Sequence, residues 1–222
     1  MTTLALPKSH PDRPIEGLAA KWYASNTADF MNEFTALAQR ISAQLTPERS
    51  VLEVAPGPGY FCVELGKLGL YKITGLDLSR AMVKIAAQKA AEAGVEAQFT
   101  QGSASNMPFP SNTFDFLLCR AAFKNFAHPV VALREMCRVL RPGGRGLIID
   151  LKRNADPTAV SRYVDNMGLK RLNRIMTRMV FKHSLIKNAY TREEFERMIA
   201  PAKFSRVEIG EEEIGFEIWL TK

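Results

Sequence analysis

Residues 51–59, with the sequence VLEVAPGPG, constrain the fold of this chain more than any other segment. A short apolar run containing an acidic residue passes into a loop of small residues, and the helix-compatible stretch 60–65 follows. A strand, a glycine loop and a helix in this order place backbone amides under a nucleotide-like ligand. Gly57 and Gly59 let the main chain approach a ligand that a Cβ atom would push away.

Asp77 ends a second apolar run, residues 72–76, about twenty residues after Gly57, the offset at which a carboxylate meets ribose hydroxyls. Two kinds of ligand compete for such a loop. A dinucleotide fingerprint needs a third glycine, and Cys62 stands in its place. Glu53 suits a cationic ligand better than a diphosphate. The loop therefore favours a nucleoside ligand without a pyrophosphate, and an oxidoreductase with a nucleotide cofactor is the alternative.

Strands and helices alternate along the rest of the chain. We expect strands at 51–54, 72–76, 96–101, 114–119, 146–151, 206–209 and 216–221, and helices at 17–45, 60–68, 80–93, 130–140, 157–183 and 192–199. This order predicts an α/β fold, a doubly wound, mostly parallel seven-stranded sheet with helices on both faces and a C-terminal antiparallel hairpin.

We expect residues 1–222 to form a single domain of four parts. Residues 17–45 are a helical cap in which Trp22, Phe30, Phe34, Leu37, Ile41 and Leu45 fall near one face. Residues 48–151 are the ligand-binding core, 157–187 a basic helical insertion, and 204–222 the terminal hairpin.

Five motifs together resemble the class I S-adenosylmethionine-dependent methyltransferases, and specifically their small-molecule and quinone-biosynthesis branches. Residues 53–59 are similar to the family's first motif, with Ala55 where the first glycine is usual. Residues 77–82 are similar to the second motif, and 101–109 to the third, with Ser103 in place of the usual acid. Residues 114–116 and 140–144 match the fourth strand and the turn before the fifth.

The resemblance implies S-adenosylmethionine as the cofactor and assigns it a set of contact residues. Asp77 would take the ribose hydroxyls, Met82 would lie over the adenine, and Ser103 would face the adenine edge. The whole set is Glu53, Ala55, Pro56, Gly57, Gly59, Asp77, Leu78, Met82, Ser103 and Ala104. Structural alternatives stay open, because Asp77 could cap a helix and Met82 could be a core residue.

The acceptor is expected beyond the carboxyl end of the fourth strand, where doubly wound sheets bind ligands. Arg120, Lys124 and Asn125 are the polar candidates there, and Tyr23 is a candidate from the N-terminal helix. Arg120 could instead pair with a helix carboxylate, and Lys124 could be a surface residue. The sequence contains no metal-ligand spacing and no nucleophile–base pair. We expect methyl transfer to a small, lipophilic or aromatic acceptor by in-line displacement.

The net charge of +7 comes from one segment, 152–187, which carries nine Lys or Arg residues against Asp156 and Asp165. The segment could be a lid over the acceptor, a contact with an anionic membrane, or a solvated helix face. A non-catalytic membrane or nucleic-acid binding module is a further alternative, although nucleic acid is disfavoured because no recognised binding module is present. The three unpatterned cysteines and the lack of a signal peptide or a membrane-spanning apolar run predict a cytoplasmic protein.

Overall fold

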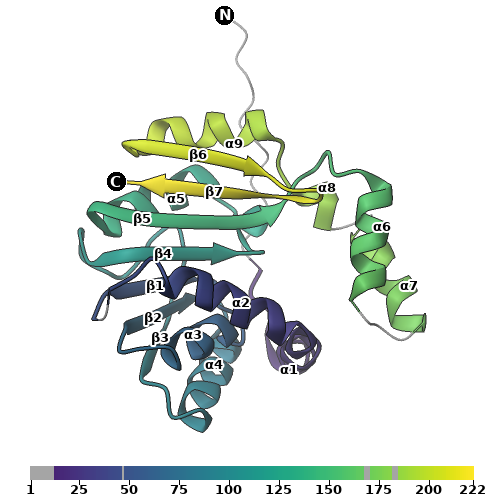
Figure 1. Ribbon diagram of the computed structural model, residues 1–222, viewed down its shortest axis with the longest axis horizontal. Helices are drawn as coiled ribbons and strands as arrows, with labels where there is room; N and C mark the ends of the chain where they lie inside the picture. The colour runs from purple at the N-terminus through teal and green to yellow at the C-terminus, as the bar shows by residue number, and fades with distance from the viewer. Residues whose placement is uncertain (1–12, 47, 168–170, 182–184) are drawn as a thin grey trace, which may run out of the picture.

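Seven strands form one sheet in the order β3-β2-β1-β4-β5-β7-β6 (Figure 1). The structure is a computed structural model that describes residues 13–46, 48–167, 171–181 and 185–222. The strands are β1 Ser50–Val54, β2 Lys72–Asp77, β3 Ala97–Gln101, β4 Phe114–Arg120, β5 Leu140–Leu151, β6 Arg206–Glu211 and β7 Gly215–Thr221. Strands β1 to β5 pair in parallel, and β7 runs antiparallel to both β5 and β6. The predicted sheet and terminal hairpin are confirmed.

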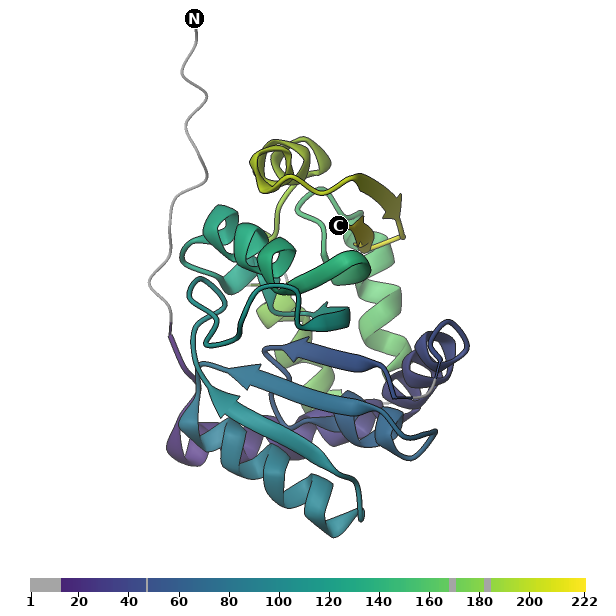
Figure 2. The ribbon, with the colours of Figure 1, turned by 90° about the vertical axis from the view of Figure 1, so that its left-hand side faces the viewer.

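Helices cover both faces of this sheet (Figure 2). The helices of the described residues are α1 Gly17–Thr27, α2 Met31–Ser42, α3 Tyr60–Gly66, α4 Arg80–Glu92, α5 Pro129–Val139, α6 Pro157–Asn166, α7 Arg171–Val180, α8 Ile186–Asn188 and α9 Arg192–Ile199, with short 3₁₀ turns at Ala28–Phe30, Phe123–Asn125 and Ala200–Ala202. Helices α2, α3 and α4 lie on one face, and α5 and α9 on the other. Helices α6 and α7 project beyond the carboxyl ends of β4 and β5 (Figure 1).

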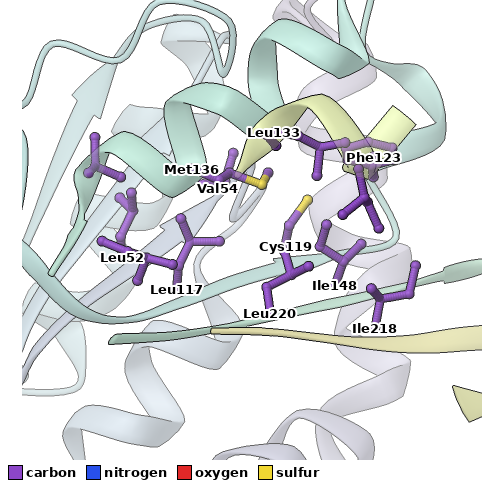
Figure 3. Packing of buried hydrophobic residues seen from close by; sticks show 14 of the residues in the cluster. Leu52, Val54, Leu117, Cys119, Phe123, Leu133, Met136, Ile148, Ile218 and Leu220 are labelled. Atoms are coloured by element: carbon purple, nitrogen blue, oxygen red, sulfur yellow. The ribbon is translucent and has the colours of Figure 1, made fainter. Parts of the chain in front are cut away.

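Alternate residues of the central strands supply the two hydrophobic cores. In β4, Leu117 and Cys119 pack into the cluster beneath α5 and α9, whereas Phe116 and Leu118 pack into the cluster beneath α2 and α3. Figure 3 shows part of the first cluster, which extends from Leu52 on β1 to Phe123 in the turn after β4. Both faces are apolar because the parallel strands are covered on both sides, as the near-continuous apolar runs predicted.

The N-terminal cap differs from the prediction. The expected single helix 17–45 is broken into α1, a 3₁₀ turn and α2. Phe34, Leu37 and Ile41 are buried, whereas Trp22, which the helical spacing placed near the same face, is 68% exposed. The break between α1 and α2 changes the direction of the helix axis, so the periodicity of α2 does not extend to α1.

Helix ends and strand ends follow local sequence signals with small shifts. Ser79 caps α4 by accepting a hydrogen bond from the Met82 amide, and Thr191 forms the predicted capping box with Glu194. Strand β5 begins at Leu140 instead of Gly146, because Leu140 already pairs with Phe114 and residues 141–144 loop out as a bulge. The basic insertion contains α6 and α7, and its residues 168–170 and 182–184 lie outside the described residues.

Candidate functional site

The glycine loop, residues 55–59, connects β1 to α3 at the carboxyl end of the sheet. Ala55, Gly57 and Gly59 all have positive φ angles, of 57°, 54° and 77°. A Cβ atom on Gly59 would lie 2.8 Å from the Cβ of Ala86, so this glycine lets α3 and α4 pack closely. A Cβ atom on Gly57 would instead lie 3.6 Å from the Tyr23 ring, an ordinary van der Waals contact. The left-handed conformation of Ala55 explains why glycine is usual at that position in related sequences.

Asp77 joins this loop to the start of α4. Its Oδ2 accepts a hydrogen bond from the Gly57 amide at 3.0 Å, and its Oδ1 accepts one from the Ser79 amide at 2.8 Å. Burial raises the pKa of the Asp77 carboxyl, the two amide hydrogen bonds oppose that shift, and the charge of Glu16 adds to it. Each carboxylate oxygen keeps a further acceptor site. Asp77 is therefore both a structural acceptor and a group able to take ligand hydroxyls.

A pocket lies beside Asp77 and is bounded by five segments of the chain. Its lining is Arg13, Pro14, Ile15, Tyr23, Ala55, Gly57, Asp77, Leu78, Ser79, Met82, Arg120, Ala121, Ala122, Asn125 and Phe126. A neighbouring hollow shares Ala55, Leu78 and Phe126 with it and continues to Ser103 and Ala104. The two hollows together give an elongated site with a carboxylate at Asp77 and small or apolar side chains on either side. Such a shape fits a nucleoside with an attached chain.

Residues 13–16 form a strap along one side of this pocket. The Ser79 hydroxyl donates a hydrogen bond to the Ile15 carbonyl at 2.6 Å. The Glu16 carboxylate accepts from the Arg80 amide at 2.8 Å and from the Ala81 amide at 3.2 Å, at the N-terminus of α4. A carboxylate is favourable there because the first amides of a helix have no partner within the helix. The strap is thus fixed to the same helix start that holds Asp77.

On the opposite side, Arg120 at the end of β4 connects the core to the cap. Its guanidinium forms an ion pair with Glu33 of α2 at 2.5 Å and lies 4.5 Å from the centre of the Phe34 ring. Burial raises the pKa of Tyr163 on α6, and a hydrogen bond to Glu33 contributes to the shift. Strand β4, the cap and the basic insertion therefore meet at Glu33, next to the pocket.

Lys124 does not line the pocket. Its ammonium donates to Asp150 Oδ1 at 2.8 Å and to the Ala121 carbonyl at 2.7 Å, and its backbone amide donates to Asp150 Oδ2 at 2.9 Å. Both side chains are buried, with 3% and 1% exposure. This buried pair shapes the turn after β4 from beneath, while Asn125 of the same turn lines the pocket.

Glu53 is also buried, with 3% exposure, and is not among the residues that line the pocket. The Cys62 thiol donates a hydrogen bond to its Oε2 at 3.0 Å. Burial raises the pKa of Glu53 to about 7, while the Cys62 bond and the charge of Arg120 pull it down. Glu53 therefore lies behind the pocket, where its carboxyl is bonded to Cys62 of α3.

The pocket and the neighbouring hollow together are lined by ten of the fourteen residues that the sequence singled out. Glu53, Pro56, Gly59 and Lys124 are the four outside their lining. The sequence missed the strap, the alanines after Arg120, and Phe126. Only Phe126 carried a signal, as an apolar residue in the loop after a central strand, whereas nothing in residues 13–15 indicates contact with a segment sixty positions away.

No cluster of His, Cys, Asp or Glu among the described residues could hold a metal ion. No helix in the described ranges is long and apolar enough to cross a membrane.

The central part of the chain is similar to known methyltransferases. Residues 52–148 match the methyltransferase domain family. The chain is 33% identical over 128 residues to the uncharacterized methyltransferase YcgJ of Bacillus subtilis, covering 57% of this chain and 50% of that protein. It is 31% identical over 149 residues to the ubiquinone/menaquinone biosynthesis C-methyltransferase UbiE of Ectopseudomonas mendocina, covering 61% of this chain and 57% of that protein. The matched region spans about half the length of these relatives.

The fold has counterparts among solved structures. A protein of Methanococcus maripaludis, whose own assignment as an S-adenosyl-L-methionine-dependent methyltransferase is provisional, superposes with a TM-score of 0.78 over 96% of both chains at 23% identity. At that identity the likeness concerns the fold, and the residues of the pocket must carry the chemistry.

Proposed function

We propose that this chain is a class I S-adenosylmethionine-dependent methyltransferase, which transfers a methyl group from that cofactor to a small lipophilic or aromatic acceptor. One observation carries the proposal: Asp77 lies between the glycine loop and α4 with its carboxylate on the elongated pocket. The bound cofactor supplies an activated methyl group, which the acceptor takes by in-line displacement.

The residues of the pocket fit such a cofactor. Asp77 offers acceptors for ribose hydroxyls, and Gly57 leaves room where a side chain would intrude. Met82 lines the pocket although only 2% of it is exposed, so it is both a core residue and a surface for an aromatic ring. The Ser103 hydroxyl already accepts from the Ser105 amide at 3.2 Å and keeps a second acceptor site for the adenine edge.

The acceptor side supports a lipophilic or aromatic compound. Apolar surface there comes from Tyr23, Ala122 and Phe126, and the polar groups are those of Arg120 and Asn125. Arg120 is already paired with Glu33, so it offers a positive charge held in a fixed orientation. A quinone-biosynthesis C-methyltransferase among the relatives agrees with an aromatic acceptor. The chain's own contribution is to hold acceptor and cofactor close and to exclude water from between them.

Calorimetry with S-adenosylmethionine, S-adenosylhomocysteine and NAD tests the cofactor. We expect both sulfur nucleosides to bind and NAD not to bind. Asp77→Ala should weaken the binding of S-adenosylhomocysteine by about 1–3 kcal/mol, because it removes a charged acceptor from the ribose. Asp29→Ala, which removes an exposed carboxylate in the cap, is the matched control. Binding of NAD alone would favour the oxidoreductase alternative.

The acceptor is tested by transfer of a labelled methyl group into fractions of a cell extract. We expect label to enter compounds that partition into organic solvent. Once a substrate is known, Arg120→Ala should raise its KM while leaving the affinity for S-adenosylhomocysteine unchanged. Label found only in proteins or nucleic acids would reject a small lipophilic acceptor.

A further inference from the structure

Exposed apolar side chains concentrate at one end of the molecule. Among the described residues, seven of the eleven exposed large hydrophobic side chains belong to the strap, α1 or α7: Ile15, Leu18, Trp22, Tyr23, Ile175, Met179 and Val180. Helices α1 and α7 both lie beyond the carboxyl ends of the parallel strands, at the end that holds the pocket (Figure 1). Soluble proteins rarely keep so much apolar surface together without a partner for it.

Two of these residues are four positions apart on each helix. Leu18 and Trp22 are four positions apart on α1 and are 84% and 68% exposed. Ile175 and Met179 have the same spacing on α7 and are 49% and 59% exposed. Residues four apart lie on the same side of a helix. An exposed tryptophan on such a face is typical of the boundary between lipid and water.

Positive charge accompanies the apolar face of α7. Arg174 and Arg178 both pair with the single carboxylate of Asp165, at 3.6 and 2.5 Å, so this group keeps a net positive charge. The segment 152–187, to which α7 belongs, carries the whole excess of +7 in the sequence. A helix with exposed apolar residues and arginines is suited to lie in the headgroup region of an anionic membrane.

We propose that α1 and α7 dock this protein on an anionic lipid bilayer, with the pocket end facing the membrane. The proposal rests on the proposed function and deepens it, because a lipophilic acceptor would then reach the pocket from the bilayer. The apolar pairs Leu18/Trp22 and Ile175/Met179 enter the interface, and arginines of α7 meet lipid phosphates. Nucleic acid would supply phosphates but no apolar phase for the leucine and methionine side chains, so a membrane fits better.

Cosedimentation with vesicles of phosphatidylglycerol and phosphatidylcholine tests the docking. We expect binding at about 25 mM salt that weakens strongly at about 300 mM salt, and little binding to vesicles of phosphatidylcholine alone. The double variants Leu18→Ser/Trp22→Ser and Ile175→Ser/Met179→Ser should each weaken binding by about tenfold or more. Leu68→Ser/Leu70→Ser is the matched control, since it removes exposed leucines that precede β2 at the opposite end of the sheet.

Trp22 provides a direct probe, because the chain has only one other tryptophan, Trp219. In a Trp219→Phe variant, emission should shift to shorter wavelength with anionic vesicles and be quenched by brominated lipid. Unchanged emission, or equal vesicle binding by both double variants and their control, would overturn the proposal. So would a dimer in sedimentation velocity that Leu18→Ser/Trp22→Ser dissociates, or binding to an RNA oligonucleotide that the same variant abolishes. Calorimetry without vesicles tests the cofactor separately, so either proposal can fail alone.

Discussion

The buried carboxyl of Glu53 should make the stability of this protein depend on pH in an unusual direction. Burial raises its pKa from the ordinary value of 4.5 to about 7, against the Cys62 hydrogen bond and the charge of Arg120, while the charge of Asp77 adds to the rise. Between these two pH values the folded state holds a proton that the unfolded state has lost. The free energy of unfolding should therefore fall as pH rises through this window and level off above it.

The size of the effect follows from the two pKa values. A difference of about 2.5 units corresponds to about 3 kcal/mol, at about 1.36 kcal/mol per unit. Glu53→Gln resembles the protonated carboxyl at every pH, so it should match the parent below about pH 4 and exceed its stability by about 3 kcal/mol near pH 8. The other titrating groups are common to both proteins and cancel in the comparison.

Urea unfolding of both proteins at constant ionic strength, at steps from about pH 4 to about pH 8.5, measures this difference. Glu96→Gln, which neutralises an exposed carboxylate, is the control and should give a constant offset. If the curves of the parent and Glu53→Gln stay parallel over the whole range, the argument that Glu53 is protonated in the folded state is wrong.

Three further predictions follow from other contacts. Lys124→Met should destabilise the fold by about 3–5 kcal/mol in chemical denaturation, because it leaves Asp150 buried without its partner, and Lys124→Met/Asp150→Leu should recover much of that loss. Ala55→Gly should stabilise the protein by up to about 1 kcal/mol in the same assay, because it relieves a left-handed alanine, and a loss of stability would contradict this. The ion pair with Arg138 lowers the pKa of Glu135, so Glu135→Gln should cost stability at neutral pH, and the cost should vanish as pH falls below about 4; a difference that persists at low pH would exclude this cause.

Seven of the ten residues that the sequence assigned to the cofactor half of the site line the pocket or the neighbouring hollow, because they come from segments close together in the chain. The glycine loop and Asp77 are separated by the short helix α3 and the strand β2. The loop is marked by its glycines, and Asp77 is marked by its position at the end of a strand. Ala55 and Ser103 differ from the residues usual in their motifs, so only the order of the motifs along the chain assigned them to the site.

The acceptor half could not be predicted in the same way. Arg120 was identified as a candidate, but its pairing with Glu33 joins positions 87 residues apart, and no local pattern specifies such a contact. Lys124 looked like a surface or acceptor residue, and only the structure reveals the buried carboxylate of Asp150 beneath it. The strap and the exposure of Trp22 depend on how the cap packs, which periodicity does not determine.

The topology of the sheet also bears on how proteins of this kind diverge. The side of the pocket proposed for the cofactor comes from three groups of residues between 54 and 105, whereas the proposed acceptor side is assembled from the strap, α1 and the turn after β4. The strap is hydrogen-bonded to the start of α4, so a change at Glu16 also affects the helix start that holds Asp77, whereas Ala122 and Asn125 reach the pocket from a separate turn. Substitutions in that turn can therefore reshape the acceptor side while the hydrogen bonds of Asp77 stay in place.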